Sequence, residues 1–305
     1  MLPTPNTFRT ASGAPGKDYF QNRADYDIKI ELDDQKQRLI GSETITYFNN
    51  SPDALRYIWL QLDQNIYDKE SNTAKTQTGA LTQSLTQNAM RYIAASQFDG
   101  GFKATAVRDT KGNALPYVIN KTMMRVDLPK AMRRGDSFTF SVDWNYNVND
   151  MTKVRGRSGY EYFPADGNCT YTIAQWFPRM VVYDDVYGWQ HKQFLGQGEF
   201  ALTFGNYRVA LTVPDDHIVG ATGDLMNEKQ VLTAKQLQRL REAQTAKDPV
   251  VIVTQDEAVQ AEKARSKGKK TWVFQAANVR DFAWCSSRKY VWDAKLCDVE
   301  GQPVW

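Results

Sequence analysis

Apolar and polar residues alternate through most of this chain. In residues 25–32 the apolar positions Tyr26, Ile28, Ile30 and Leu32 share one face, and acidic or basic side chains share the other. A period of two predicts a half-buried strand of an antiparallel sheet. Similar patterns predict further strands at 42–50, 56–64, 102–109, 122–129, 137–148, 200–205 and 206–214.

The period changes only in the last third of the chain. Leu237, Leu240 and Ala243 have helical spacing, and Thr233 is a candidate N-cap for that short helix. Residues 254–257 form a capping box that opens a second short helix, and strand character returns at 250–254 and 269–292. The prediction is a mainly β protein, a large curved antiparallel β-sandwich or saddle with two short helices.

The chain divides by composition rather than by linkers. Residues 1–18 are rich in Pro, Gly, Thr and Ser and predict a flexible or wrapping arm. Residues 19–298 predict one β domain, with a polar insertion at about 68–92 that has few large apolar residues. Residues 299–305 are interpreted as the start of a connection to a further domain.

Charge and cysteine content narrow the function classes. The chain has 305 residues and a net charge of +3, from 38 basic and 35 acidic side chains, so it carries no overall electrostatic footprint for nucleic acid. No apolar run reaches the roughly 20 residues of a membrane span. Cys285 and Cys297 could pair and leave Cys169 free, but three reduced thiols are the preferred interpretation.

No complete set of catalytic residues is evident from motifs. The two histidines, His191 and His217, belong to no H-E-x-x-H motif and are interpreted as surface or packing residues. There is no G-x-S-x-G elbow. Asp184 and Asp185 are adjacent, so in extended chain they point to opposite sides, which favours caps and turn contacts over shared chemistry.

One long segment resembles a known family. Residues 175–225, QWFPRMVVYDDVYGWQHKQFLGQGEFALTFGNYRVALTVPDDHIVGATGDL, are similar to the N-terminal domain of M1-family zinc metallopeptidases, the aminopeptidase N-like enzymes, and best to a bacterial branch. Phe177-Pro178 matches the family's Phe-Pro element, and Asp184-Asp185 matches the acidic position after it. The resemblance extends over most of residues 20–295.

The resemblance implies a saddle-shaped domain that packs on a separate catalytic domain and forms one wall of the substrate cleft. The family's H-E-x-x-H and G-x-M-E-N-like signatures do not occur in this sequence. We therefore expect the zinc and the removal of N-terminal amino acids to belong to a longer parent enzyme. This fragment is expected to hold no cofactor and no catalytic residue, and to be inactive alone. The family also suggests a periplasmic, secreted or envelope-associated location in a bacterium.

In the family, a polar residue shortly before the Phe-Pro element helps hold the free α-amino group of the substrate. The corresponding window here contains Asp166, Asn168 and Gln175, our candidate substrate-binding residues. The expected partners are the parent's catalytic domain and the N-terminus of a peptide; no nucleic acid and no membrane-spanning segment are expected. Removing the catalytic domain should also leave aromatic residues such as Trp189 or Trp292 uncovered.

Two other hypotheses stay open at this stage. A free-standing β-sandwich could bind carbohydrate or a protein partner, with the aromatic residues of segment 173–190 as a platform. A hydrolase with dispersed catalytic residues ranks last, because nothing in the sequence assembles them.

Overall fold

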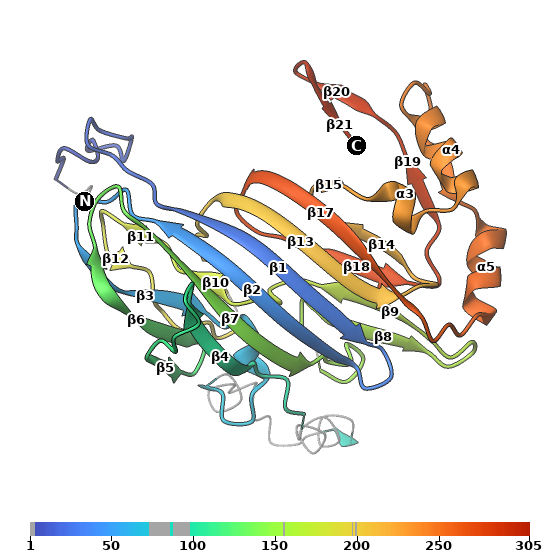
Figure 1. The fold of residues 1–305 in the computed structure, drawn as a ribbon, viewed down its shortest axis with the longest axis horizontal. Helices are drawn as coiled ribbons and strands as arrows, with labels where there is room; N and C mark the ends of the chain where they lie inside the picture. Colours follow the sequence, from blue (N-terminus) through green and yellow to red (C-terminus); the bar gives the residue numbers. More distant parts are fainter. Residues whose placement is uncertain (1–3, 73–85, 88–97, 155, 197, 199) are drawn as a thin grey trace.

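In the computed structural model, which describes residues 4–72, 86–87, 98–154, 156–196, 198 and 200–305, strands dominate (Figure 1). A large seven-stranded sheet forms one layer. Its strands in spatial order are β15 (Asp224–Leu225), β17 (Lys269–Val279), β13 (Gly205–Pro214), β1 (Arg23–Asp33), β2 (Arg38–Phe48), β7 (Ser137–Asn147) and β4 (Lys103–Asp109).

Two four-stranded sheets cover the inner face of the large sheet. The first has the order β10 (Arg179–Met180), β3 (Leu55–Gln61), β6 (Met123–Met132) and β5 (Tyr117–Asn120). The second has the order β14 (Ile218–Ala221), β18 (Trp284–Ser287), β9 (Asn168–Ile173) and β8 (Gly159–Phe163). Three two-stranded ribbons complete the strands: β11 (Tyr183–Asp184) with β12 (Gly188–Trp189), β16 (Val250–Val253) with β19 (Trp292–Ala294), and β20 (Cys297–Val299) with β21 (Gln302–Val304).

The predicted alternation is confirmed along the long strands. In β1, the apolar face from Ala24 to Leu32 is buried and the charged face is exposed or half-buried. One feature of the sheet departs from the prediction: β1 pairs with β13 in parallel, Tyr26 opposite Tyr207, whereas every other neighbouring pair of that sheet is antiparallel. The two strands are far apart in sequence, so a hairpin turn does not impose their direction.

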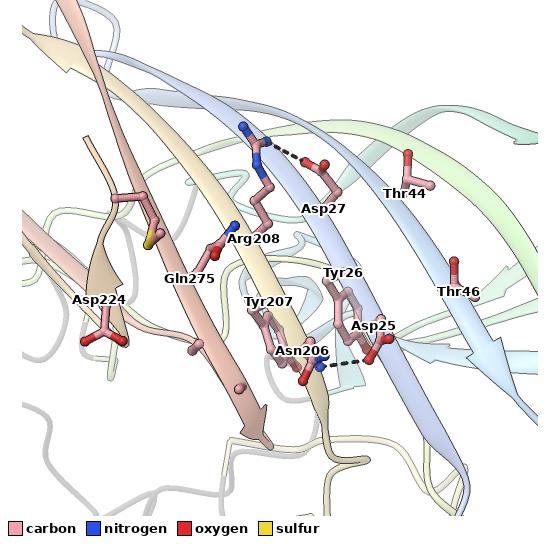
Figure 2. Close-up of a pocket in the computed structure, with 13 residues that line it drawn as sticks. Asp25, Tyr26, Asp27, Thr44, Thr46, Asn206, Tyr207, Arg208, Asp224 and Gln275 are labelled. Carbon is pink, nitrogen blue, oxygen red and sulfur yellow. Dashed lines mark hydrogen bonds and ion pairs between the residues drawn. The ribbon is translucent and has the colours of Figure 1, made fainter. Parts of the chain in front are cut away.

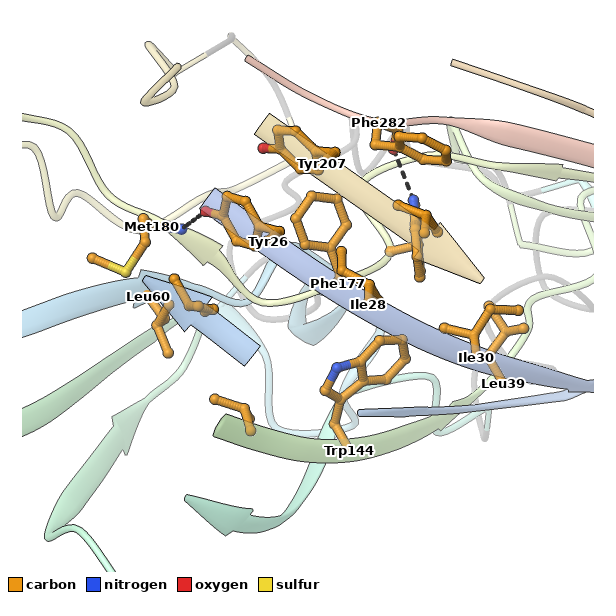
Figure 3. Close-up of a cluster of buried hydrophobic side chains, with 14 of the residues drawn as sticks. Tyr26, Ile28, Ile30, Leu39, Leu60, Trp144, Phe177, Met180, Tyr207 and Phe282 are labelled. Carbon is orange, nitrogen blue, oxygen red and sulfur yellow. Dashed lines mark hydrogen bonds between the residues drawn. The ribbon is translucent and has the colours of Figure 1, made fainter. Parts of the chain in front are cut away.

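The core lies between the large sheet and the two smaller ones, and its centre is aromatic (Figure 3). The rings of Tyr26 and Tyr207 stack with centroids 4.6 Å apart, and the ring of Phe177 meets both edge-on. The Tyr26 hydroxyl also accepts a hydrogen bond from the Met180 backbone N–H at 2.9 Å. Such pairs add to the stabilisation from burial itself.

The α-helices whose bounds lie within the described residues gather near the C-terminal end of the chain (Figure 1). They are α3 (Glu228–Val231), α4 (Ala234–Ala243) and α5 (Gln255–Lys263), together with the 3₁₀ turn η1 (Asp63–Tyr67). The predicted capping box is present at Thr254 with Glu257. The predicted N-cap, Thr233, is also confirmed, and it forms a second capping box with Gln236. Within the described residues, none of the helices is both long enough and apolar enough to span a bilayer.

Several boundaries differ from the sequence predictions. The strand predicted over 56–64 ends at Gln61, because the chain then turns into η1. Residues 200–204 form no strand apart from a single bridge at Leu202, and the hairpin of β8 and β9 was not predicted. Most of the polar insertion at about 68–92 lies outside the described residues.

Candidate functional site

The three candidate residues lie at opposite ends of β9. Asp166 and Asn168 lie at the turn into this strand, and Gln175 lies just beyond its last residue, Ile173. A strand rises about 3.3 Å per residue, so the two ends are on the order of 15–20 Å apart. The structure therefore does not bring the three residues together.

Asp166 and Asn168 already have partners within the domain. The Asp166 carboxylate forms an ion pair with Lys289 and accepts a hydrogen bond from the Asn168 backbone N–H at 2.9 Å. The Asn168 amide donates to the Glu262 carbonyl at 3.0 Å, and the side chain is buried. These contacts tie the β8–β9 turn to the end of α5, so both residues serve the fold.

Gln175 differs in its backbone and in its side chain. Its φ is +52°, in the left-handed region that a residue with a Cβ rarely occupies. The other described non-glycine residues with positive φ are Gln37, Lys121 and Glu300 in hairpin turns, and Asn278 beside a bulge. Gln175 instead lies on the connection between two different sheets. Its side chain is half-buried and has no hydrogen-bond partner among the described residues.

Buried groups hold the backbone around Gln175 on both sides. The Ala174 N–H donates to the Ser158 hydroxyl at 3.2 Å, and the Gln175 carbonyl accepts from the Gln64 amide at 3.1 Å. The Trp176 indole N–H donates to the Phe282 carbonyl at 2.8 Å. Strained conformations of this kind persist only where the surroundings fix them, and they cluster at functional sites.

A buried ion cluster holds the far end of this connection. Arg179 donates to Asp63 at 2.7 and 3.0 Å and to Asp281 at 2.8 Å. The Arg179 and Asp63 side chains are only 5% and 1% exposed, while Asp281 reaches the surface. Desolvation raises the pKa of the Asp63 carboxyl, although the charge and the hydrogen bonds of Arg179 oppose that shift. Neither Asp63 nor Gln64 was a sequence candidate, since partners more than a hundred positions away leave no local pattern.

The aromatic segment 173–190 is mainly part of the core. Trp176 and Phe177 have no exposed surface. The expectation of an uncovered Trp189 is wrong, because this side chain is only 8% exposed and packs beside Tyr47 and Tyr183; Trp292 is half-buried. Tyr187, at the tip of the β11–β12 ribbon, is the exposed aromatic of this segment, at 72%.

The two residues of the acidic pair make separate contacts, and only those of Asp184 are the local turn contacts that the sequence predicted. Asp184 accepts from the backbone N–H groups of Val186 and Tyr187 and from the Gln190 side chain. Asp185 binds Arg9 through both carboxylate oxygens. The two carboxylates therefore do not face one ligand.

The outer face of the large sheet carries a polar hollow of about 540 Å³ (Figure 2). Two pairs of its lining residues contact each other. Arg208 contacts Asp27 at 3.3 Å, and Asp25 accepts from the Asn206 backbone N–H at 2.8 Å. These residues are the solvent-facing positions of alternating strands, and we assign them no chemistry.

The histidines and cysteines do not assemble a metal centre in the described part of the chain. His217 is buried and hydrogen-bonds the Ser286 hydroxyl through Nδ1 at 2.8 Å, whereas His191 is exposed and stacks on Trp59. The three cysteines are free thiols. The described residues include no group of three or more His, Cys, Asp or Glu that could hold a metal ion, so they do not fit the zinc of the family.

Comparison with known proteins gives structural neighbours alone. No family model matches the chain, and neither does any curated protein. The chain is similar to the crystal structure of an M1 zinc metallopeptidase from Deinococcus radiodurans, with a TM-score of 0.44 and 13% identity, over 87% of this chain and 42% of that one. A two-domain M1 zinc metallopeptidase variant bound to L-tryptophan gives a TM-score of 0.43 and 12% identity, over 90% and 44%. The chain thus spans less than half the length of these proteins.

Proposed function

We propose that this chain is the N-terminal β domain of a zinc aminopeptidase and forms one wall of its substrate cleft. In this proposal Gln175 accepts a hydrogen bond from the free α-ammonium group of a peptide. The observation that carries it is the left-handed backbone of Gln175, combined with a side-chain amide that has no partner among the described residues. Its position, two residues before Phe177-Pro178, agrees with the sequence resemblance to the M1 family.

The chemistry of the amide suits this role. An α-ammonium group that leaves water needs oxygen acceptors in fixed positions. A glutamine Oε1 supplies one without adding a charge to the wall of the cleft. Because its backbone is held by Ser158, Gln64 and the buried Trp176, the acceptor would be positioned before the ligand arrives.

The peptidase chemistry itself is assigned to a separate zinc domain of the parent enzyme, which would be the main partner of this chain. Purified alone, the chain is expected to show no turnover of amino-acid anilides and no stoichiometric zinc. Turnover that a chelator abolishes would contradict the assignment of the peptidase chemistry to a separate domain.

The role of Gln175 is tested by NMR on the chain with ¹⁵N-labelled glutamine side chains. Leucinamide, which has a free amine, should shift the Gln175 amide signals, and N-acetyl-leucinamide should not. Gln175→Met should remove the response, while Gln21→Met, an exposed glutamine on the surface, should keep it. Equal responses to the free and acetylated amides would contradict the proposal.

The alternative, a free-standing module with an aromatic platform, gains little from the geometry. Such a platform needs exposed rings, and Trp176, Phe177 and Trp189 are buried. Tyr187 alone would remain for that purpose in segment 173–190, so the cleft-wall function is the better supported.

A further inference from the structure

The 3₁₀ turn η1 touches the connection that carries Gln175. We propose that Gln64, in this turn, is the positioning residue that keeps Gln175 in its left-handed conformation. The inference deepens the proposed function and rests on it for the use of that conformation, but the conformation can be measured independently of any ligand.

Gln64 makes its contact from inside the protein. Its side chain is 2% exposed, and its Nε2 donates to the Gln175 carbonyl at 3.1 Å. Its Oε1 is also buried and has no hydrogen-bond partner in the described part of the chain. An amide with one unsatisfied end is an unfavourable choice for a core, which an apolar residue of the same length would fill better. A glutamine at this position is explained if the other end of its amide makes a hydrogen bond that an apolar side chain cannot make.

The neighbours of Gln64 fix where its amide lies. Asp63 is bound to Arg179 and accepts from Gln61 at 2.9 Å. On the other side, Asn65 donates to the Lys121 carbonyl at 2.7 Å and accepts from the Phe102 N–H at 2.8 Å. The residues before and after Gln64 are therefore anchored to four segments: β10, β3, the β5–β6 turn and the residue that precedes β4. Among the described residues, the side chain of Gln64 makes one hydrogen bond, to the Gln175 carbonyl.

The contact acts on the backbone angle directly. The carbonyl of a residue turns with its φ and ψ, so a fixed donor opposite the Gln175 carbonyl favours the angles that point it there. Without that donor, the conformational energy of a residue with a Cβ is lower at negative φ, so Gln175 would return there. The Cα–Cβ bond would then change direction and carry the side-chain amide away from its present position.

The test uses Gln64→Met, which keeps the length and volume of the side chain but removes the donor. The readout is the intraresidue distance from the amide proton to Hα of Gln175, which is short only at positive φ. We expect the strong cross-peak of the left-handed form in the wild type and its loss in the variant. The affinity for leucinamide should fall roughly fivefold, about the worth of one hydrogen bond.

The matched control is Gln236→Met, which removes a similarly buried glutamine from the α4 capping box. It should lower stability yet leave the Gln175 cross-peak unchanged. If Gln64→Met does not fold, Gln64→Asn replaces it in the test. Its side chain is one methylene shorter, so its amide no longer reaches the Gln175 carbonyl. A Gln64 variant that loses stability but keeps the left-handed cross-peak of Gln175 would contradict the positioning role and show that Gln64 only stabilises the fold. A wild type that shows the cross-peak but binds no leucinamide would sink the proposed function and leave the positioning role standing.

Discussion

At the scale of single residues, two titratable groups are buried without the partners that usually accompany them. Both oxygens of Glu43 lack a hydrogen bond within the described structure, and burial raises the pKa of this carboxyl well above its usual value. His217 has one bond, to Ser286, while its Nε2 has none there. Burial lowers the pKa of His217 from 6.5 to about 3, helped by the charges of Arg288 and Lys270 and opposed by Asp216.

The His217 shift predicts a pH dependence of stability. The unfolded chain gains a proton on this histidine below 6.5, while the folded chain stays neutral until about 3. Stability is therefore lost as the pH falls through this window, by about 1.4 kcal/mol per pH unit from this one group. Denaturant unfolding between pH 6.5 and 4 should show a shallower slope for His217→Asn than for the wild type. His191→Asn is the control and should keep the wild-type slope; a wild-type slope in both would show that His217 is not the source.

At the scale of elements, the close packing of β7 against β2 requires a glycine at position 41. Gly41 lies opposite Trp144, whose indole fills the space that a side chain at 41 would occupy. A Cβ at this position would come within 2.3 Å of Trp144 Cζ2. Trp144 cannot move away easily, because it packs against Phe102, Tyr146 and Trp176.

Gly41→Ala is therefore expected to destabilise the fold by about 1–3 kcal/mol, the usual cost of overpacking a filled core. The neighbouring Ser42 points to solvent, so Ser42→Ala should change the unfolding free energy by less than about 0.5 kcal/mol. Thermal and denaturant unfolding measure both. A Gly41→Ala variant as stable as wild type would mean that the Trp144 indole can shift at little cost.

At the scale of the whole molecule, side-chain contacts join the N-terminal arm to the β domain. Arg9 binds Asp185 through paired contacts of 2.8 Å, and its guanidinium lies over the Tyr19 ring. The Asp185 side chain is 3% exposed and that of Arg9 is 31% exposed. Whether residues 1–18 are a flexible or a wrapping arm stays a prediction, which the following variant tests.

Arg9→Met should leave the Asp185 carboxylate buried without its cation. We expect a loss of about 1–3 kcal/mol, between the values for exposed and buried pairs, and faster tryptic cleavage after Lys17, the trypsin site of the arm that this variant keeps. The double variant Arg9→Met with Asp185→Asn should recover part of the loss, because no uncompensated charge remains. Equal protease resistance in wild type and Arg9→Met would show that other contacts, such as Phe8 against Phe20, hold the arm.

The sequence by itself determined the β class, most long strands and both capped helices. Alternation along a strand and an N-cap three residues from its partner are local, so residues such as Ile28, Ile30 and Thr254 carry the information in their own neighbourhood. The resemblance to the M1 family, and not a local pattern, placed Gln175 among three candidates. It could not separate Gln175 from Asp166 and Asn168, since all three are polar residues in one window.

The tertiary structure gives the three residues different surroundings. Asp166 pairs with Lys289, and Asn168 donates to the Glu262 carbonyl. The connection on which Gln175 lies is instead held by the hydrogen bond from Gln64 and by the ion pair of Arg179 with Asp63. The parallel pairing of β1 with β13 and the burial of Trp189 were decided at the same level. Each depends on segments brought together from distant parts of the chain, and such contacts leave no periodic trace in the sequence.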